Sequence, residues 1–264
     1  MKHALALIAA LALFSANSVC AAEVPNLDDP KVREKILKEA VLLDALEERL
    51  GPHAGLRLYE VGKQFPFTGW AKNKFKQNQD QMTAIWGCKV GEFSGPYRKW
   101  YANGQKAEEG VYAHGKLEGT NLQWHKNGKK AMQSIYVNGK IEGLQTVWHP
   151  NQQKHSEGNW EKGLQIGKWT DWHENGKMYA QSSFENGKPH GKATNWHATG
   201  QKSVVNNYQN GKLNGPSASW YEDGKKLREL NYKNGKKDGK FIAWDQKGKI
   251  LASTFFVDGK NVGK

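Results

Sequence analysis

The stretch Gly119–Glu142, GTNLQWHKNGKKAMQSIYVNGKIE, is the unit from which most of this chain is built. A glycine recurs every 24 residues, with a tryptophan five residues later and another aromatic residue seventeen later. The glycines are Gly95, Gly119, Gly143, Gly167, Gly191, Gly215, Gly239 and Gly263, and the tryptophans are Trp100, Trp124, Trp148, Trp172, Trp196, Trp220 and Trp244. A strict period of 20–50 residues is typical of solenoids and linear arrays. The sequence therefore predicts a repeat protein, and we number positions within a repeat from its glycine as position 0.

Two turn signals in each repeat predict two strands. Asn127-Gly128 lies at positions 8 and 9, and Asn138-Gly139 lies at positions 19 and 20. Asn-Gly between alternating aromatic segments indicates a two-residue type I′ hairpin turn, because both central residues of that turn need a positive φ. We therefore expect an all-β repeat array, an antiparallel β-hairpin meander of about fourteen short strands with a short N-terminal α-helix.

Two-residue loops at both turns would fix the pairing of side chains across each hairpin. They place Tyr136 opposite Gly119, where its ring could cover the glycine as in designed sheets. They also place Trp124 opposite Ala131, at position 12. Because side chains alternate along a strand, the tryptophans and the aromatic residues of position 17 should lie on opposite faces of the sheet.

The repeated pattern resembles a known family. Trp100-Tyr101-Ala102-Asn103-Gly104-Gln105-Lys106, followed by an aromatic-x-Asn-Gly-Lys segment, is similar to the bacterial MORN-variant repeat. The resemblance covers 95–264 strongly and 55–94 weakly. It implies an elongated hairpin array used for binding and brings no catalytic residues. Proteins of this family are often named antitoxin-like, which implies an inhibitor role.

The N-terminus has the pattern of a secretory signal peptide. Lys2 precedes the apolar run Ala4–Phe14, and small residues follow up to Ala22. A charged start, a short apolar run and a small-residue cleavage site predict removal of residues 1–22 and an exported, periplasmic or secreted protein. The alternative is a lipoprotein attached through Cys20. No later segment of the sequence is apolar enough to predict a transmembrane helix.

Residues 23–94 differ from the array that follows. Asp29 and Pro30 predict a helix start, and apolar spacing predicts an amphipathic helix over 31–50 within an N-terminal cap of residues 23–54. Residues 55–94 are expected to form an irregular first repeat, and residues 95–264 seven regular repeats. Cys88 remains as a single cysteine after cleavage, and it is interpreted either as a small buried hydrophobic residue or as a reactive thiol.

The array is basic and aromatic. Residues 95–264 contain 27 Lys and Arg against 15 Asp and Glu, a net charge of +12. Turn lysines commonly serve solubility and discourage edge pairing of sheets, but a basic array would also attract polyanions. The candidate binding surface consists of the seven tryptophans, the histidines that follow four of them and four lysines of position 11: His125, His149, His173, His197, Lys130, Lys154, Lys202 and Lys226.

No residue set suggests an enzyme, a metal or a cofactor. Histidines in successive repeats lie two strands apart, roughly 9–10 Å, which is too far for one zinc ion. We interpret them as an exposed amphipathic row. The sequence also lacks a paired nucleophile and base. It predicts a non-enzymatic scaffold or inhibitor with an unknown protein partner. The alternative is a module that binds anionic glycan or phospholipid headgroups of the cell envelope; nucleic acid is disfavoured by the predicted export.

Overall fold

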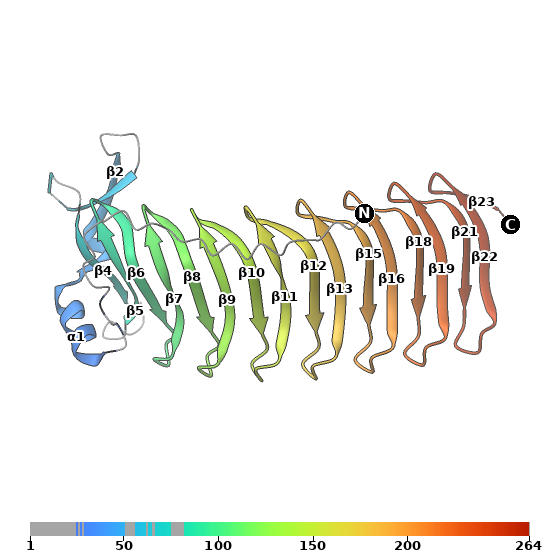
Figure 1. Ribbon diagram of the computed structural model, residues 1–264, viewed down its shortest axis with the longest axis horizontal. Helices are drawn as coiled ribbons and strands as arrows, with labels where there is room; N and C mark the ends of the chain where they lie inside the picture. The colour runs from blue at the N-terminus through green and yellow to red at the C-terminus, as the bar shows by residue number, and fades with distance from the viewer. Residues whose placement is uncertain are drawn as a thin grey trace, which may run out of the picture.

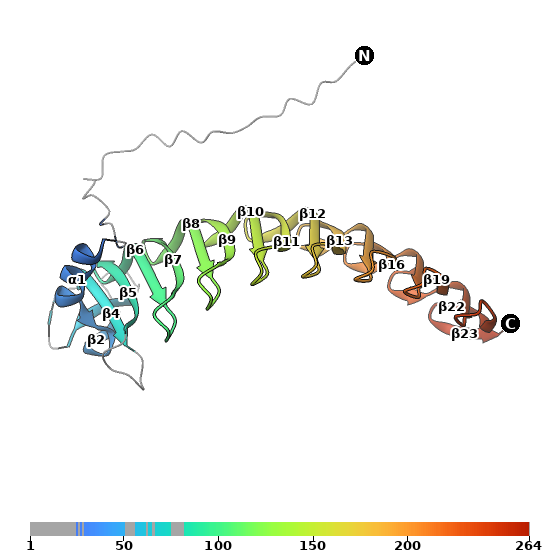
Figure 2. The same ribbon diagram turned by 90° about the horizontal axis from the view of Figure 1, so that it is seen from below.

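The computed structural model shows a long, gently curved array of strands with a small cap at its N-terminal end (Figures 1 and 2). The structure describes residues 25, 27, 29–50, 56–61, 63–64, 67–74 and 82–263. The predicted signal peptide, with Cys20, lies outside the described residues. No helix in the described part of the chain combines the length and apolar character needed to cross a membrane.

One sheet runs through nearly the whole described chain, and its strands follow each other in sequence order. The helix α1 spans Pro30–Glu39 and the 3-10 turn η1 spans Leu43–Ala45. The strands before the regular array are β1 Val41–Leu42, β2 Leu46–Leu50, β3 Leu56–Glu60, β4 Gly69–Lys74 and β5 Met82–Lys89. The array consists of β6 Glu92–Trp100, β7 Lys106–Ala113, β8 Lys116–Trp124, β9 Lys130–Val137, β10 Lys140–Trp148, β11 Lys154–Glu161, β12 Leu164–Trp172, β13 Met178–Glu185, β14 Lys188–Pro189, β15 Gly191–Trp196, β16 Lys202–Gln209, β17 Lys212–Leu213, β18 Gly215–Trp220, β19 Lys226–Lys233, β20 Lys236–Lys237, β21 Gly239–Trp244, β22 Ile250–Val257 and β23 Lys260–Gly263.

The predicted antiparallel hairpin meander is confirmed. From β4 to β23 the neighbouring hairpin strands pair antiparallel, and the short strands β14, β17 and β20 pair only with the strand before them. Three first strands are interrupted, which separates β14 from β15, β17 from β18 and β20 from β21. The sheet is therefore quasi-one-dimensional, because each repeat contacts mainly its neighbours in sequence.

The second turn of each repeat has the predicted geometry. Val137 pairs directly with Lys140, which leaves the two-residue loop Asn138-Gly139. Asn138 has φ 51° and Gly139 has φ 80°, so both central residues are left-handed as a type I′ turn requires. The Asn-Gly dipeptide therefore predicted this turn correctly.

The first turn differs from the prediction. The backbone N–H of His125 donates to Lys129 O at 2.8 Å and that of Gly128 donates to His125 O at 2.9 Å, which leaves a three-residue loop. Only the glycine has a positive φ there, the pattern of a type I turn followed by a left-handed glycine. The register then shifts by one residue, so Trp124 pairs with Lys130 and not with Ala131.

This bulge decides which face carries the lysines of position 11. The pairing of Gly119 with Tyr136 holds as predicted. Alternation along β8 and β9 then places the tryptophans and the aromatic residues of position 17 on opposite faces. Because of the bulge, Lys130 lies on the same side as Trp124. We call this side the tryptophan face and the other the tyrosine face.

The repeat glycines are required by backbone conformation. Gly119 has φ 72°, a left-handed value that an L side chain adopts only at a cost. A Cβ added there would meet no atom within 4 Å. The expected covering of Gly119 by the ring of Tyr136 is therefore wrong, since the ring does not reach the Cβ position. The glycine instead permits a local break in regular pairing that bends each strand.

The N-terminal helix is shorter than predicted. Asp29 caps α1, as expected, and its carboxylate accepts the N–H of Lys31 at 2.8 Å. The helix ends at Glu39, because the next residues pair with strands: Val41 lies beside Ala71 in a parallel pairing, and β2 pairs with β3. Residues 40–50 are rich in the helix formers Ala, Leu and Glu, so the pairing with β4 and β3 overrides a local helical preference, as tertiary context often does.

The cap covers both faces of the first strands, with α1 on one side of β4 and β5 and β2 on the other (Figure 2). Leu27 and Ile36 pack with Ile85 and Trp100 on the tryptophan face. Cys88 packs with Leu58, Phe67 and Ala71 on the tyrosine face. Burial raises the pKa of the Cys88 thiol to about 11, so at neutral pH it stays protonated and behaves as a hydrophobic residue.

Candidate binding surface

The tryptophan face carries a ladder in which four of the five lysines of position 11 cover the tryptophan of the next repeat. All seven tryptophans are half-buried. The ammonium groups lie over the indole rings at distances typical of cation–π contacts. The pairs are Lys106 over Trp124 at 4.7 Å, Lys130 over Trp148 at 5.5 Å, Lys154 over Trp172 at 5.7 Å and Lys226 over Trp244 at 5.5 Å.

Most of these lysines also have a polar partner three residues later. Lys154 forms an ion pair with Glu157 at 2.7 Å, and Lys226 forms one with Glu229 at 2.7 Å. Lys130 donates to the amide oxygen of Gln133 at 3.3 Å. Lys154 and Lys226 are therefore charge-paired within the array, whereas Lys130 has a neutral amide as its polar partner. Among the described residues, Lys202 makes no such contact.

The four candidate histidines connect neighbouring repeats. The Nε2 atom of His125 lies 2.8 Å from the carbonyl oxygen of Trp148, 23 residues later. The three other candidate histidines contact the carbonyl oxygens of Trp172, Trp196 and Trp220 in the same way, and the hydroxyl of Tyr101 donates to Trp124 O. A carbonyl only accepts, so each ring donates through Nε2–H. The prediction of an exposed row is wrong, because these rings are half-buried structural links.

The asparagines of the first turn form a second set of links. The Asn127 carboxamide oxygen accepts the N–H of Lys129 at 3.1 Å, which stabilises the turn. Its nitrogen donates to Pro150 O at 3.2 Å in the next repeat. The described residues contain no group of three or more side chains able to hold a metal ion.

The tyrosine face is packed closely between repeats and exposes little. Tyr97 and Asn121 are buried, and Glu108 accepts hydrogen bonds from Tyr97 at 2.6 Å, Lys99 at 2.7 Å and Asn121 at 3.1 Å. Burial alone would raise the pKa of Glu108, but these hydrogen bonds outweigh it and lower that pKa. Further along, the Trp169 ring packs edge-on against Trp160 at 5.4 Å. This face therefore serves as the core of the array.

Positive charge is concentrated in the C-terminal part of the array. Residues 191–264 contain 14 Lys and Arg against 6 Asp and Glu, a net charge of +8, whereas residues 95–190 contain 13 against 9, a net charge of +4. Several lysines of the C-terminal part are exposed and form no ion pair among the described residues, including Lys192, Lys212, Lys240 and Lys260. They offer more accessible charge than the stacked lysines of the tryptophan face.

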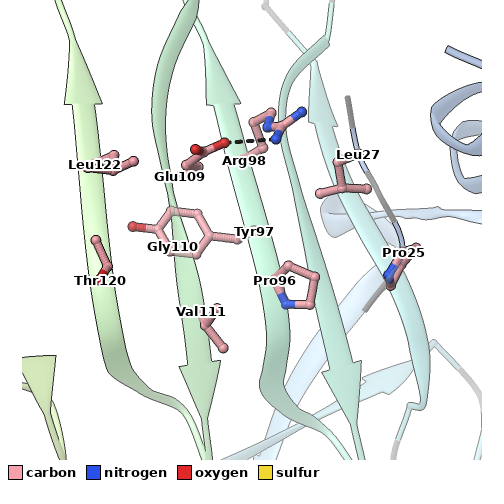
Figure 3. Close-up of a pocket in the computed structure, with 10 residues that line it drawn as sticks. All are labelled: Pro25, Leu27, Pro96, Tyr97, Arg98, Glu109, Gly110, Val111, Thr120 and Leu122. Carbon is pink, nitrogen blue, oxygen red and sulfur yellow. Dashed lines mark hydrogen bonds and ion pairs between the residues drawn. The ribbon is translucent and has the colours of Figure 1, made fainter. Parts of the chain in front are cut away.

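A hollow of about 390 Å³ opens on the tryptophan face where the N-terminal segment meets the first two repeats (Figure 3). Pro25 and Leu27 form one wall, and Val111 and Leu122 lie on the other side. The remaining lining residues are Pro96, Tyr97, Arg98, Glu109, Gly110 and Thr120. An ion pair between Arg98 and Glu109 at 2.8 Å crosses this region.

Sequence reasoning missed this hollow. Its only signal was that the first repeats carry apolar residues, such as Val111 and Leu122, where later repeats carry polar ones, such as Ser183 and Thr170. The position of the N-terminal segment beside them depends on tertiary packing, which the repeat pattern does not contain.

Three segments of the chain match the sequence family described as the MORN repeat variant: residues 94–114, 165–186 and 213–234. Each begins one or two residues before a repeat glycine and extends toward the second turn, so each match covers the hairpin unit described above. No curated protein matches the chain.

Among solved structures, one match is a chain of the "Crystal Structure of TcdB2-TccC3-Cdc42". The two chains share 9% identity with a TM-score of 0.19, and the match covers 76% of this chain but 14% of that one. This likeness supports no functional argument. The elongated meander is the architecture of a binding or scaffold module, and no enzyme family is indicated. Over three of its repeats, this chain is thus similar to the MORN repeat variant.

Proposed function

We propose that this chain is a non-enzymatic, exported scaffold or inhibitor, antitoxin-like in mode of action, which binds a partner protein along its tryptophan face. Export rests on the signal-peptide pattern of residues 1–22. A mass measurement of the protein recovered from the producing cell tests it, because cleavage after Ala21 or Ala22 removes a defined mass, whereas lipidation of Cys20 would add one.

The observation that carries the proposal is the pairing of lysine with both indole and carboxylate. Lys154 covers Trp172 and is neutralised by Glu157, and Lys226 repeats the arrangement with Trp244 and Glu229. Such a surface combines aromatic area with balanced charge. Interface cores in proteins are rich in aromatic residues and poor in unpaired charge. The tryptophan face therefore fits a protein better than a polyanion.

The second candidate function is binding of anionic glycan or phospholipid headgroups at the cell envelope. The net charge of +8 over residues 191–264, with several exposed lysines that form no ion pair, favours it. Attraction of this kind depends on long-range charge and is screened by salt. The two candidates thus involve different residues of the same array.

The experiment immobilises the mature protein, exposes it to envelope extract at low and high salt, and analyses retained protein, lipid and glycan. Affinities of the retained component are then measured for three forms of the chain. One is wild type. The second replaces Lys192, Lys212, Lys240 and Lys260 with Gln. The third is Trp172→Ala, with Trp172→Phe as the control that keeps an aromatic ring.

A protein partner bound at the tryptophan face should lose at least about tenfold in affinity with Trp172→Ala, as expected for an aromatic anchor. Trp172→Phe should lose less, and the four-glutamine variant should bind nearly as well as wild type. Retention of glycan or lipid that disappears at high salt and in the four-glutamine variant would reject the scaffold proposal and establish the second candidate. Thermal unfolding of each variant confirms that it is folded.

A further inference from the structure

We propose that the hollow beside Leu27 is the docking site for an extended, uncharged segment of a partner protein that carries Leu, Ile or Pro side chains. This inference deepens the proposed function and rests on it, because it places one part of the partner contact on the tryptophan face.

The N-terminal segment shows how a chain occupies this face. Leu27 is 5% exposed, although it lies before the start of α1 at Pro30. It packs into the cluster formed with Ile36 and Ile85, while Pro25 extends along the hollow beside Pro96 (Figure 3). Pro25 and Leu27 of this chain are thus already held against the first repeat.

The apolar surface continues past the part that this segment covers. Val111 is 41% exposed, Ile135 is 39% exposed and Leu144 is 48% exposed, and all three lie on the tryptophan face on β7, β9 and β10. Along each of these strands, the neighbouring side chains point to the opposite, tyrosine face. A strip of this kind, exposed beside a covered stretch, marks an interaction surface.

The repeat fold does not require these apolar residues. Ile135 occupies position 16 and Leu144 occupies position 1. In the next repeats the same positions hold Ser183 at position 16 and Lys168 and Lys192 at position 1, on strands with the same pairing. The array therefore forms equally with polar residues there, and the aliphatic strip of the first three repeats serves something other than folding.

The charge of the hollow selects an uncharged occupant. Glu109 pairs with Arg98 at 2.8 Å and with Lys106 at 2.9 Å, and the Arg98 side chain is only 7% exposed. Lys106 also lies over the ring of Trp124, so each charge at the hollow already has a partner. A charged ligand group would lose its hydration without gaining a free counter-charge. Aliphatic side chains, by contrast, gain from covering Val111 and Leu122.

The size and direction of the hollow select an extended peptide. About 390 Å³ lies near the lower end of the range for ligand sites and accommodates a few side chains. The apolar strip then crosses successive strands from β7 to β10, so the occupant must be long and narrow.

The test pans a phage-displayed library of random linear peptides on the full mature chain. Each enriched peptide is synthesised with a fluorescent label, and its binding is measured by anisotropy. The test variants are Leu122→Lys and Ile135→Lys. Their matched controls are Thr170→Lys and Ser183→Lys, which introduce the same charge at positions 3 and 16 of a later repeat. Thermal unfolding establishes that all four variants fold.

We expect enriched peptides to be uncharged and rich in Leu, Ile and Pro. Ile135→Lys and Leu122→Lys should each weaken them by at least about tenfold, whereas the two controls should change affinity by less than about twofold. The proposal is overturned if no peptide is enriched, if the enriched peptides are acidic, or if test and control variants lose binding equally.

Two further outcomes separate this inference from the proposed function. A wild-type dimer in light scattering that Ile135→Lys converts to a monomer would assign the strip to a second copy of this chain and reject the peptide site. Failure of peptide binding, with partner capture still sensitive to Trp172→Ala, would reject the peptide site and leave the scaffold function standing. Failure of peptide binding, together with partner capture that is insensitive to Trp172→Ala, would reject both the peptide site and the scaffold function.

Discussion

The carboxamide of Asn121 donates a hydrogen bond to the hydroxyl of Tyr97 at 2.6 Å, and the two residues occupy position 2 of successive repeats. Both are almost fully buried, at 2% and 1% exposure. The same carboxamide also reaches Glu108 at 3.1 Å. A single asparagine thus fixes the register between two repeats through polar contacts that would be costly to leave unmade.

Substitution of this asparagine tests the coupling. Asn121→Ala should lower the free energy of unfolding by about 1–3 kcal/mol, because it removes buried hydrogen bonds of Tyr97 and Glu108. Gln123→Ala, on the same strand and face but half-buried, is the control and should cost less. Urea unfolding measures both. Equal losses for the two variants would show that the polar contact contributes no more than ordinary packing.

Gly158 is required for space, in contrast to the repeat glycines. A Cβ at Gly158 would lie 2.1 Å from the Trp169 ring. Gly158→Ala should therefore destabilise the protein by about 1–3 kcal/mol, as over-packing does. In a double-mutant cycle with Trp169→Leu, the cost of Gly158→Ala should shrink. An unchanged cost in that background would mean that the clash with Trp169 is not its cause.

Gln152 occupies a place where other first turns carry glycine. Its φ is 78°, close to the 78° and 79° of Gly128 and Gly176 at the same position. Gln152→Gly should raise the free energy of unfolding by about 1 kcal/mol, since a left-handed residue with a side chain is strained by about that amount. The side chain's bond to Lys130 O at 3.1 Å is lost in exchange. A lower melting temperature for Gln152→Gly would show that this bond outweighs the strain.

Stability should fall at alkaline pH. Burial raises the pKa of Tyr97, Tyr112 and Tyr136 above the ordinary value near ~10. The unfolded chain then releases these protons at lower pH than the folded chain, so their contribution is complete below pH ~10 and is lost as pH rises above it. Ultraviolet titration of phenolate should show these tyrosines ionising only with unfolding. Ionisation of all nine tyrosines in the folded state would contradict this.

Removal of one whole repeat should leave a folded protein. Deleting residues 143–166 joins two equivalent positions, and the ring of His125 then meets the carbonyl of Trp172 in place of Trp148. Because each repeat contacts mainly its neighbours, cooperative unfolding should survive. Deleting residues 143–154 joins a first-strand position to a second-strand position and should abolish it. Calorimetry distinguishes the two deletions, and equal damage from both would refute the modular account.

Local chemistry made much of this fold predictable from sequence. The 24-residue period defined the unit, and Asn138-Gly139 predicted a type I′ turn that needs no tertiary partner. Alternation then separated Trp124 from Tyr136 on opposite faces. Each of these features depends on backbone conformation within a few residues. The residue types and their spacing in the sequence therefore suffice to predict it.

The rest depended on contacts between repeats. Asn127-Gly128 has the same dipeptide as the second turn, but its carboxamide bonds to the next repeat and the loop takes three residues. The resulting bulge moves Lys130 to the tryptophan face, where it covers Trp148. Position 11 alone could not reveal this, because a shift of one residue in register reverses the face of a side chain.

By itself, the sequence determined a repeated hairpin unit, its 24-residue period and the separation of its tryptophans from the aromatic residues of position 17 on opposite faces. Only the tertiary structure decided where α1 ends, which lysines are neutralised, that the His125 ring bonds to a carbonyl of the next repeat, and where an apolar hollow opens beside Leu27. The physical reason is that turns are selected by local dihedral preferences, whereas these features depend on the register and on contacts that the folded array brings together.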